Sequence, residues 1–162
     1  MKRLPLLLAL GGPALLGLWL AIRVESCGFA QGTIGLPLAV LATALISVPA
    51  LYIGAAVFKA APSPGVVVAG IARSLDDAGL VLLGLMPAVL FLGATARSSK
   101  IALLLGLLAL GGSAVFGLRL AFSRLFTTAE ARVRVLPVFG AWAVVTLGIG
   151  LTMVKSFVEG LQ

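Results

Sequence analysis

The sequence predicts an all-α integral membrane protein: a bundle of five transmembrane helices with short loops, forming a single transmembrane domain over residues 1–162. Hydrophobic residues make up 61% of the chain and charged residues only 10%, whereas soluble globular domains have about 45–50% and about 25%. A soluble fold of this size would need more polar side chains to cover its surface. The few charged residues also stand mainly between long apolar runs.

Five of these runs are long enough to cross a bilayer as helices. A span needs about 20 mostly apolar residues, because each residue adds about 1.5 Å of rise. Helices are required because the hydrocarbon contains no water to satisfy the backbone polar groups. The expected spans are residues 4–22, 35–58, 78–96, 101–122 and 135–154.

The first run also has features of a signal peptide. Lys2 and Arg3 form a basic start, and Gly28-Phe29-Ala30 resembles a cleavage site. However, the apolar stretch is longer than the about 7–15 residues of a typical signal peptide. We therefore expect the first helix to be retained.

The segment between the second and third runs, residues 60–77, is too long for a turn and too polar for a span. Residues 62–65 (PSPG) break the second helix, because a proline disfavours helix in the residue before it. Residues 66–73 are expected to form a short interfacial helix. Ser74, with an acid three residues later, then predicts a capping box for the third span. The alternative is that Asp76 and Asp77 form a functional pair of acids.

The remaining connections are short. Only residues 97–100 separate the third and fourth runs, which predicts a tight antiparallel hairpin. Arg119 follows Ile101 by a rise of about 27 Å, so its charge is expected at the far interface, with a functional intramembrane arginine as the alternative. Thr127 and Glu130 repeat the capping pattern before the fifth run.

The distribution of basic residues predicts the orientation. Five spans place the termini on opposite sides, and cytoplasmic loops are enriched in Lys and Arg. One side carries eight basic residues and the other four, the eight being Lys2, Arg3, Lys59, Arg73, Arg119, Arg124, Arg132 and Arg134. We expect a cytoplasmic N-terminus and a periplasmic or extracellular C-terminus. The abundance of Ala, Gly, Leu and Arg further suggests a bacterial inner-membrane protein.

Two sets of residues are candidates for contacts. Arg119, Arg124, Arg132 and Arg134 form a basic cluster, which is expected to bind anionic lipid headgroups or an acidic cytoplasmic partner; Asp76 and Asp77 lie on the same side and could pair with part of it. Small residues recur every fourth position on the fourth span and favour close helix packing: Ala109, Ser113, Gly117 and Ala121.

The chain lacks the residues that most catalytic chemistry requires. It has no His, one Cys and no phosphate-binding loop, so a Ser-His triad and the common zinc sites are excluded. No acid lies in the middle of a span, and the basic residues are spread between spans, unlike a nucleic-acid footprint. We expect no enzyme activity, no cofactor, no metal and no nucleic-acid partner, and interpret Cys27 as a small loop residue.

Residues 49–54 (PALYIG) and 79–87 (GLVLLGLMP) resemble bacterial members of the Yip-type family. The resemblance covers about residues 35–96. It implies five spans, a cytoplasmic N-terminus and a non-enzymatic membrane scaffold. The acidic-aromatic motif of the eukaryotic members has no counterpart, so binding of small GTPases is not implied.

Two functional hypotheses follow. The first is a structural or interaction subunit of a larger complex, with a membrane-protein partner or a second copy; it predicts a dry, apolar centre. The alternative is a small transporter or channel component. It predicts a continuous cavity lined by some of the polar residues of the spans: Thr43, Ser47, Tyr52, Ser113 or Thr146.

Overall fold

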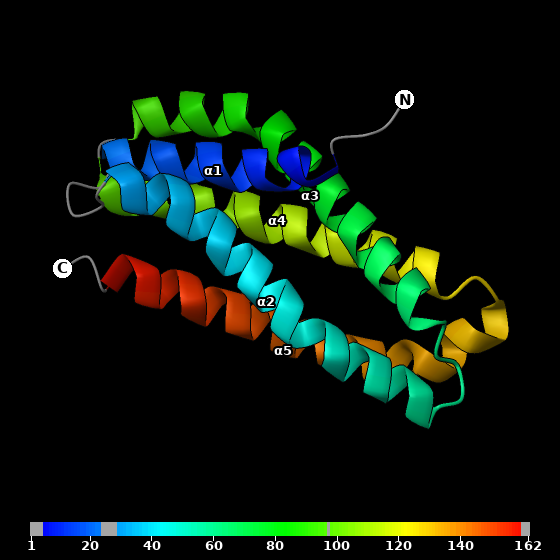
Figure 1. Ribbon diagram of the computed structural model, residues 1–162. Helices are drawn as coiled ribbons and strands as arrows, with labels where there is room; N and C mark the ends of the chain where they lie inside the picture. The colour runs from blue at the N-terminus through cyan, green and yellow to red at the C-terminus, as the bar shows by residue number, and fades with distance from the viewer. Residues whose placement is uncertain (1–4, 24–28, 97, 160–162) are drawn as a thin grey trace.

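A computed structural model describes residues 5–23, 29–96 and 98–159, and this part of the chain is an antiparallel helical bundle. Each helix runs roughly opposite to the one before it, so α1 begins and α5 ends at opposite ends of the bundle (Figure 1). The helices are α1 (Pro5–Arg23), α2 (Phe29–Val57), α3 (Pro64–Thr95), α4 (Ser99–Leu125) and α5 (Ala129–Glu159). Cys27, Lys2, Arg3 and Arg97 lie outside the described residues.

Among the described residues, each of the five apolar runs lies on one helix, with only Phe58 and Ala96 just past a helix end, which confirms the all-helical fold class. Four helices are long and apolar enough to cross a membrane: α2 over Gly32–Val57, α3, α4, and α5 over Ala129–Val154. Helix α1 contributes a shorter apolar segment, Ala9–Arg23. The structure is therefore compatible with a helical membrane bundle.

The second helix ends before the prolines as expected, since residues 58–63 are not helical, but the separate interfacial helix and the Ser74 capping box are wrong. Helix α3 is continuous from Pro64, with Ser63 as its N-cap, so no separate interfacial helix forms. Pro64 is tolerated there because the first residues of a helix need no backbone donor. Ser74 lies inside the helix, and its hydroxyl donates to the Gly70 carbonyl at 2.8 Å. The helix is about 48 Å long, at about 1.5 Å per residue.

The other helix starts follow local capping. The Ser98 hydroxyl accepts from the Lys100 amide at 3.2 Å at the start of α4. At the start of α5 the Thr128 hydroxyl accepts from the Ala131 amide at 3.3 Å, one residue later than the expected Thr127 cap. Each hydroxyl satisfies an N–H group that has no partner within its helix.

Helices α1, α3 and α4 pack together, whereas α2 pairs with α5 (Figure 1). Helix α1 contacts both α2 and α3, and glycines allow this close approach. A Cβ atom at Gly12 would lie 2.6 Å from the Gly79 carbonyl oxygen of α3, and one at Gly17 would overlap the Gly32 carbonyl of α2. In contrast, α4 makes few contacts with α5, and α2 makes few with α3.

Two hydrophobic clusters pack in opposite halves of the bundle. The Trp19 cluster joins α1 to the other helices through residues that include Leu16, Trp19, Leu36, Leu82, Met86 and Ala102. The Phe139 cluster joins α2, α3, α4 and α5 near the loop between α4 and α5. It includes Leu51, Ile71, Ala121, Phe126, Val135 and Phe139. The residues between these clusters surround the candidate site.

Candidate functional site

A cavity of about 180 Å³ lies between the Trp19 cluster and the Phe139 cluster. All five helices contribute to its wall, and no charged side chain lines it. The polar side chains in the wall are Thr43, Ser74, Ser113, Trp142 and Thr146. The centre of the bundle is therefore apolar, but it is not completely filled.

Most of the hydroxyl groups in the wall are already bonded to their own helices. Thr43 Oγ1 donates to the Ala39 carbonyl at 2.8 Å and lies 3.5 Å from Met153 Sδ. Ser113 Oγ donates to the Leu110 carbonyl at 2.8 Å. Thr146 Oγ1 is buried and has no hydrogen-bond partner among the described residues. The Thr43 and Ser113 hydroxyls thus use their only hydrogens within their own helices and could serve an occupant only as acceptors, which leaves Thr146 as the hydroxyl free to donate.

The cavity includes some of the residues expected for a transport path and excludes others. Thr43, Ser113 and Thr146 line it, whereas Ser47 and Tyr52 do not. The Ser47 side chain is 4% exposed, and its carbonyl accepts from Trp142 Nε1 at 2.7 Å. Tyr52 packs against the Phe139 cluster.

The cavity extends along only part of the bundle. On α4 its wall runs over residues 107–121, about 21 Å at about 1.5 Å per residue, whereas a bilayer core is about 30 Å thick. Members of the Trp19 cluster and of the Phe139 cluster both contribute to its wall. No continuous polar path along the bundle axis is visible among the described residues.

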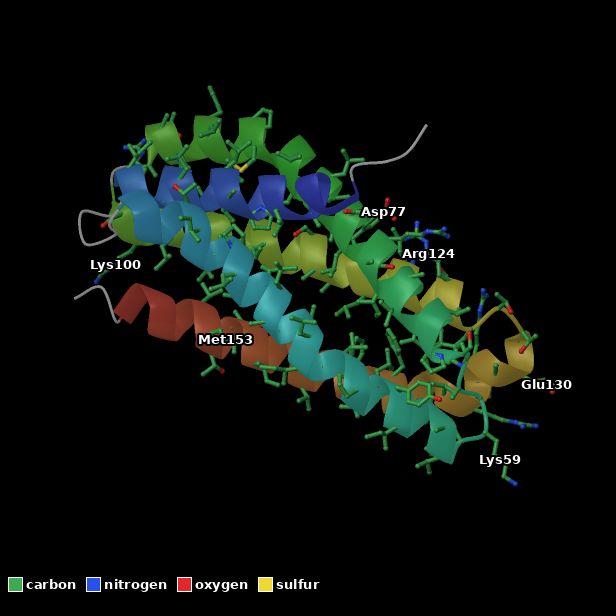
Figure 2. All side chains as sticks on the ribbon, viewed as in Figure 1. Lys59, Asp77, Lys100, Arg124, Glu130 and Met153 are labelled. Carbon is green, nitrogen blue, oxygen red and sulfur yellow. The ribbon has the colours of Figure 1, made fainter. Side chains whose placement is uncertain are left out.

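The expected pairing of an acid with the basic cluster is confirmed at one position. Arg124 Nη2 lies 2.5 Å from Asp77 Oδ2, and Arg124 Nη1 donates to Ser74 Oγ at 3.3 Å. These contacts tie the last turn of α4 to the middle of α3 (Figure 2). Asp77 is thus engaged in a structural ion pair. This contact argues against the alternative that Asp76 and Asp77 form a functional pair of acids.

The other members of the basic cluster have different positions. Arg132, on the first turn of α5, donates from Nε to the Phe126 carbonyl at 2.6 Å and from Nη2 to the Ser123 carbonyl at 3.4 Å. It therefore caps the C-terminus of α4. Arg119 and Arg134 are exposed and do not line the cavity.

The small-residue stripe of α4 lies against α3 and the cavity. Ala109, Ser113, Gly117 and Ala121 are all buried. A Cβ atom at Gly117 would lie 2.8 Å from Ala78 Cβ. The same stripe contributes Ser113, Gly117 and Ala121 to the cavity wall, so it both packs the helix pair and shapes the cavity.

One cross-helix contact has no counterpart in the sequence analysis. Arg23, in the last turn of α1, donates through Nη2 to the Gly93 carbonyl near the end of α3. The carbonyls of a final helical turn lack partners within the helix, and a cation is favourable there. The basic last turn of α1 signals such a cap, but the sequence does not reveal which helix end receives it.

The described residues contain no group of three or more His, Cys, Asp or Glu side chains that could hold a metal ion. Comparison of the chain with known proteins gave no match to a family model, to a curated protein or to a solved structure. The proposals below therefore depend on the geometry and chemistry of this chain.

Proposed function

We propose that this chain is a non-enzymatic, multi-pass protein of the bacterial inner membrane that acts as a structural or interaction subunit of a larger membrane complex. The observation that carries this proposal is the poor burial of α5. Only 11% of its apolar window is buried inside the bundle, against 28% for each of α3 and α4. A span with so little intramolecular packing is free to contact another membrane protein or a second copy.

The glycines of α5 support the same assignment. Nothing lies within 4 Å of a Cβ atom built at Gly140 or Gly148. Glycine weakens a helix by about 1 kcal/mol relative to alanine, and in membrane helices it permits the close approach of another backbone. The exposed side chains Val144 and Leu151, at 71% and 59%, lie on the same helix.

The positions of the charges support the proposed orientation. Lys59 and Glu130 lie at one end of the bundle and Lys100 at the other (Figure 2). The end with Lys59 also carries Arg132 and Arg134 at the start of α5, which suits a cytoplasmic side next to anionic headgroups. Five antiparallel helices with ends on opposite sides agree with the topology that the Yip-type resemblance implies.

Purification of the tagged chain from native membranes in mild detergent tests this proposal. We expect a complex above the monomer mass, with a stoichiometric partner or second copy identified by mass spectrometry. Gly148→Leu should disrupt it, because the new side chain blocks close approach to α5. Gly84→Leu is the control, since Gly84 is equally unpacked on α3. A monomer, or a complex insensitive to Gly148→Leu, would contradict the proposal.

The cavity favours a second candidate, a small transporter or channel component. Its apolar wall, which has no charged side chain, suits an apolar substrate and not an ion. Reconstituted vesicles containing the protein are therefore expected to retain their ion gradients. A selective ion flux above that of empty vesicles would instead favour an ion-conducting component.

A further inference from the structure

The cavity between the Trp19 and Phe139 clusters has the chemistry of a site for an apolar ligand. Its volume of about 180 Å³ exceeds the about 150 Å³ of a cavity that stays dry and binds benzene. Water in a buried site needs about two to four polar partners, and most hydroxyls in this wall are bonded to their own helices. An apolar occupant is therefore favoured over water.

The way into this cavity is through the side of the bundle. The helices that line it pack weakly in two pairs, since α4 makes few contacts with α5 and α2 makes few with α3. Gly111 of α4 lies in the wall with nothing within 4 Å of a Cβ atom built there. The cavity is therefore open at the side of the bundle, between weakly packed helices.

The surroundings of the bundle are apolar in a membrane. Large apolar side chains on the outer faces of α4 and α5 are strongly exposed, for example Leu108 at 64% and Val144 at 71%. Such faces are compatible with hydrocarbon and not with water. The molecules that meet the side opening are then the acyl chains of lipids.

We propose that the cavity binds part of one acyl chain of a membrane phospholipid, which enters through the side of the bundle. A helix of a partner protein is about 10 Å wide with its side chains, so even one of its turns has a larger volume than the cavity. A single chain of methylene groups is thin enough, and its contacts with the wall replace those that an empty cavity lacks. The proposal concerns a lipid site and is independent of the protein partner proposed above.

Trp142 is a built-in reporter for this site. It lines the cavity, and the chain has only one other tryptophan, Trp19, which is 7% exposed in the cluster named after it. A Trp19→Phe variant leaves Trp142 as the sole tryptophan. It would be reconstituted, at a low ratio of protein to lipid, in phosphatidylcholine vesicles with or without bromine at the middle of the acyl chains, because bromine in contact with tryptophan quenches its fluorescence.

Adjacent glycines of α4 provide matched variants. Gly111 lines the cavity, whereas Gly112 is exposed outside it, and neither has a neighbour within 4 Å of its Cβ position. We expect the brominated lipid to quench Trp142 and Gly111→Leu to reduce this quenching at least about twofold, because the new side chain takes the space of the acyl chain. Gly112→Leu should leave the quenching unchanged.

A second pair of variants tests the site independently, in case Gly111→Leu does not fold. Gly150 of α5 lies in the cavity wall facing Thr43, and Gly140 is exposed on the same helix. Gly150→Leu should again reduce the quenching, and Gly140→Leu should not. A Trp142→Phe variant, in which only Trp19 emits, should show weak quenching.

Three results would overturn the proposal. In the first, quenching is absent, or is unaffected by both cavity-filling variants in folded protein, so the acyl chain does not enter. In the second, acrylamide quenches Trp142 strongly, which indicates a water-filled cavity. In the third, quenching rises as the protein is diluted in the membrane, which indicates that a second copy covers the site.

Discussion

Arg124 of α4 and Asp77 of α3 form an ion pair, with 2.5 Å between Nη2 and Oδ2. The same guanidinium donates to Ser74, whose hydroxyl donates in turn to the Gly70 carbonyl. Three groups of α3 are thus joined to the last turn of α4. Because Ser74 also lines the cavity, this polar chain fixes one side of the cavity wall.

Removal of this ion pair should destabilise the bundle by a small amount. The side chains of Arg124 and Asp77 are 36% and 35% exposed, so solvent screens their attraction and the coupling is expected at about 0.5–1 kcal/mol. A double-mutant cycle of Asp77→Asn and Arg124→Gln, measured by unfolding in detergent, isolates this coupling. The cycle of Asp77→Asn with Arg119→Gln is the control. Equal coupling energies in the two cycles would refute a specific Arg124–Asp77 interaction.

Loss of the Arg132 cap should loosen the connection between α4 and α5. Its guanidinium donates to the Phe126 and Ser123 carbonyls at 2.6 and 3.4 Å, and a partly exposed charged donor of this kind is worth about 1 kcal/mol. Arg132→Gln is therefore expected to lower the melting temperature in detergent. Arg134→Gln removes a similar charge from the same helix and serves as the control. If both variants melt at the same temperature as the parent, the cap does not stabilise the bundle.

Gly117 should tolerate no larger residue in the contact between α3 and α4. A methyl group there would lie 2.8 Å from Ala78 Cβ and 3.1 Å from the Ser74 carbonyl oxygen, and overpacking typically costs about 1–3 kcal/mol. We expect Gly117→Ala to lower the free energy of unfolding, and Ala78→Gly to restore part of it. Gly112→Ala, on an open part of the same helix, should be neutral or stabilising. Equal effects of Gly117→Ala and Gly112→Ala would contradict this packing.

The helical content of the chain could be predicted because it depends on local sequence. Each run of apolar residues is long enough to indicate a helix without knowledge of its neighbours, and the described residues of all five lie in helices except Phe58 and Ala96 at run ends. The start of α3 could not be predicted in this way. Pro64 is equally consistent with a break and with the first residue of a helix, and the Arg124 guanidinium that donates to Ser74 is 50 residues away in the sequence.

The candidate site was only partly visible for the same reason. The small-residue stripe of α4 indicated a packed face, but the cavity arises because α2 and α5 diverge from α3 and α4. That divergence depends on the angles between helices, and the sequence pattern of a single helix does not determine these angles. The partners of Arg23 and Arg132 are backbone carbonyl groups. Because every residue has such a carbonyl, the sequence does not indicate which one an arginine will contact.

The proposed orientation makes a prediction for the two ends of α4. Ser98 precedes this helix and Ser123 lies in its last turn, so about 25 residues of helix, or about 38 Å, separate them. In a Cys27→Ser background, a membrane-impermeant maleimide added outside intact cells should label Ser98→Cys and not Ser123→Cys. After permeabilisation both should react, which shows that each site is accessible. Labelling of only Ser123→Cys in intact cells would invert the orientation, and labelling of both would mean that α4 does not span the membrane.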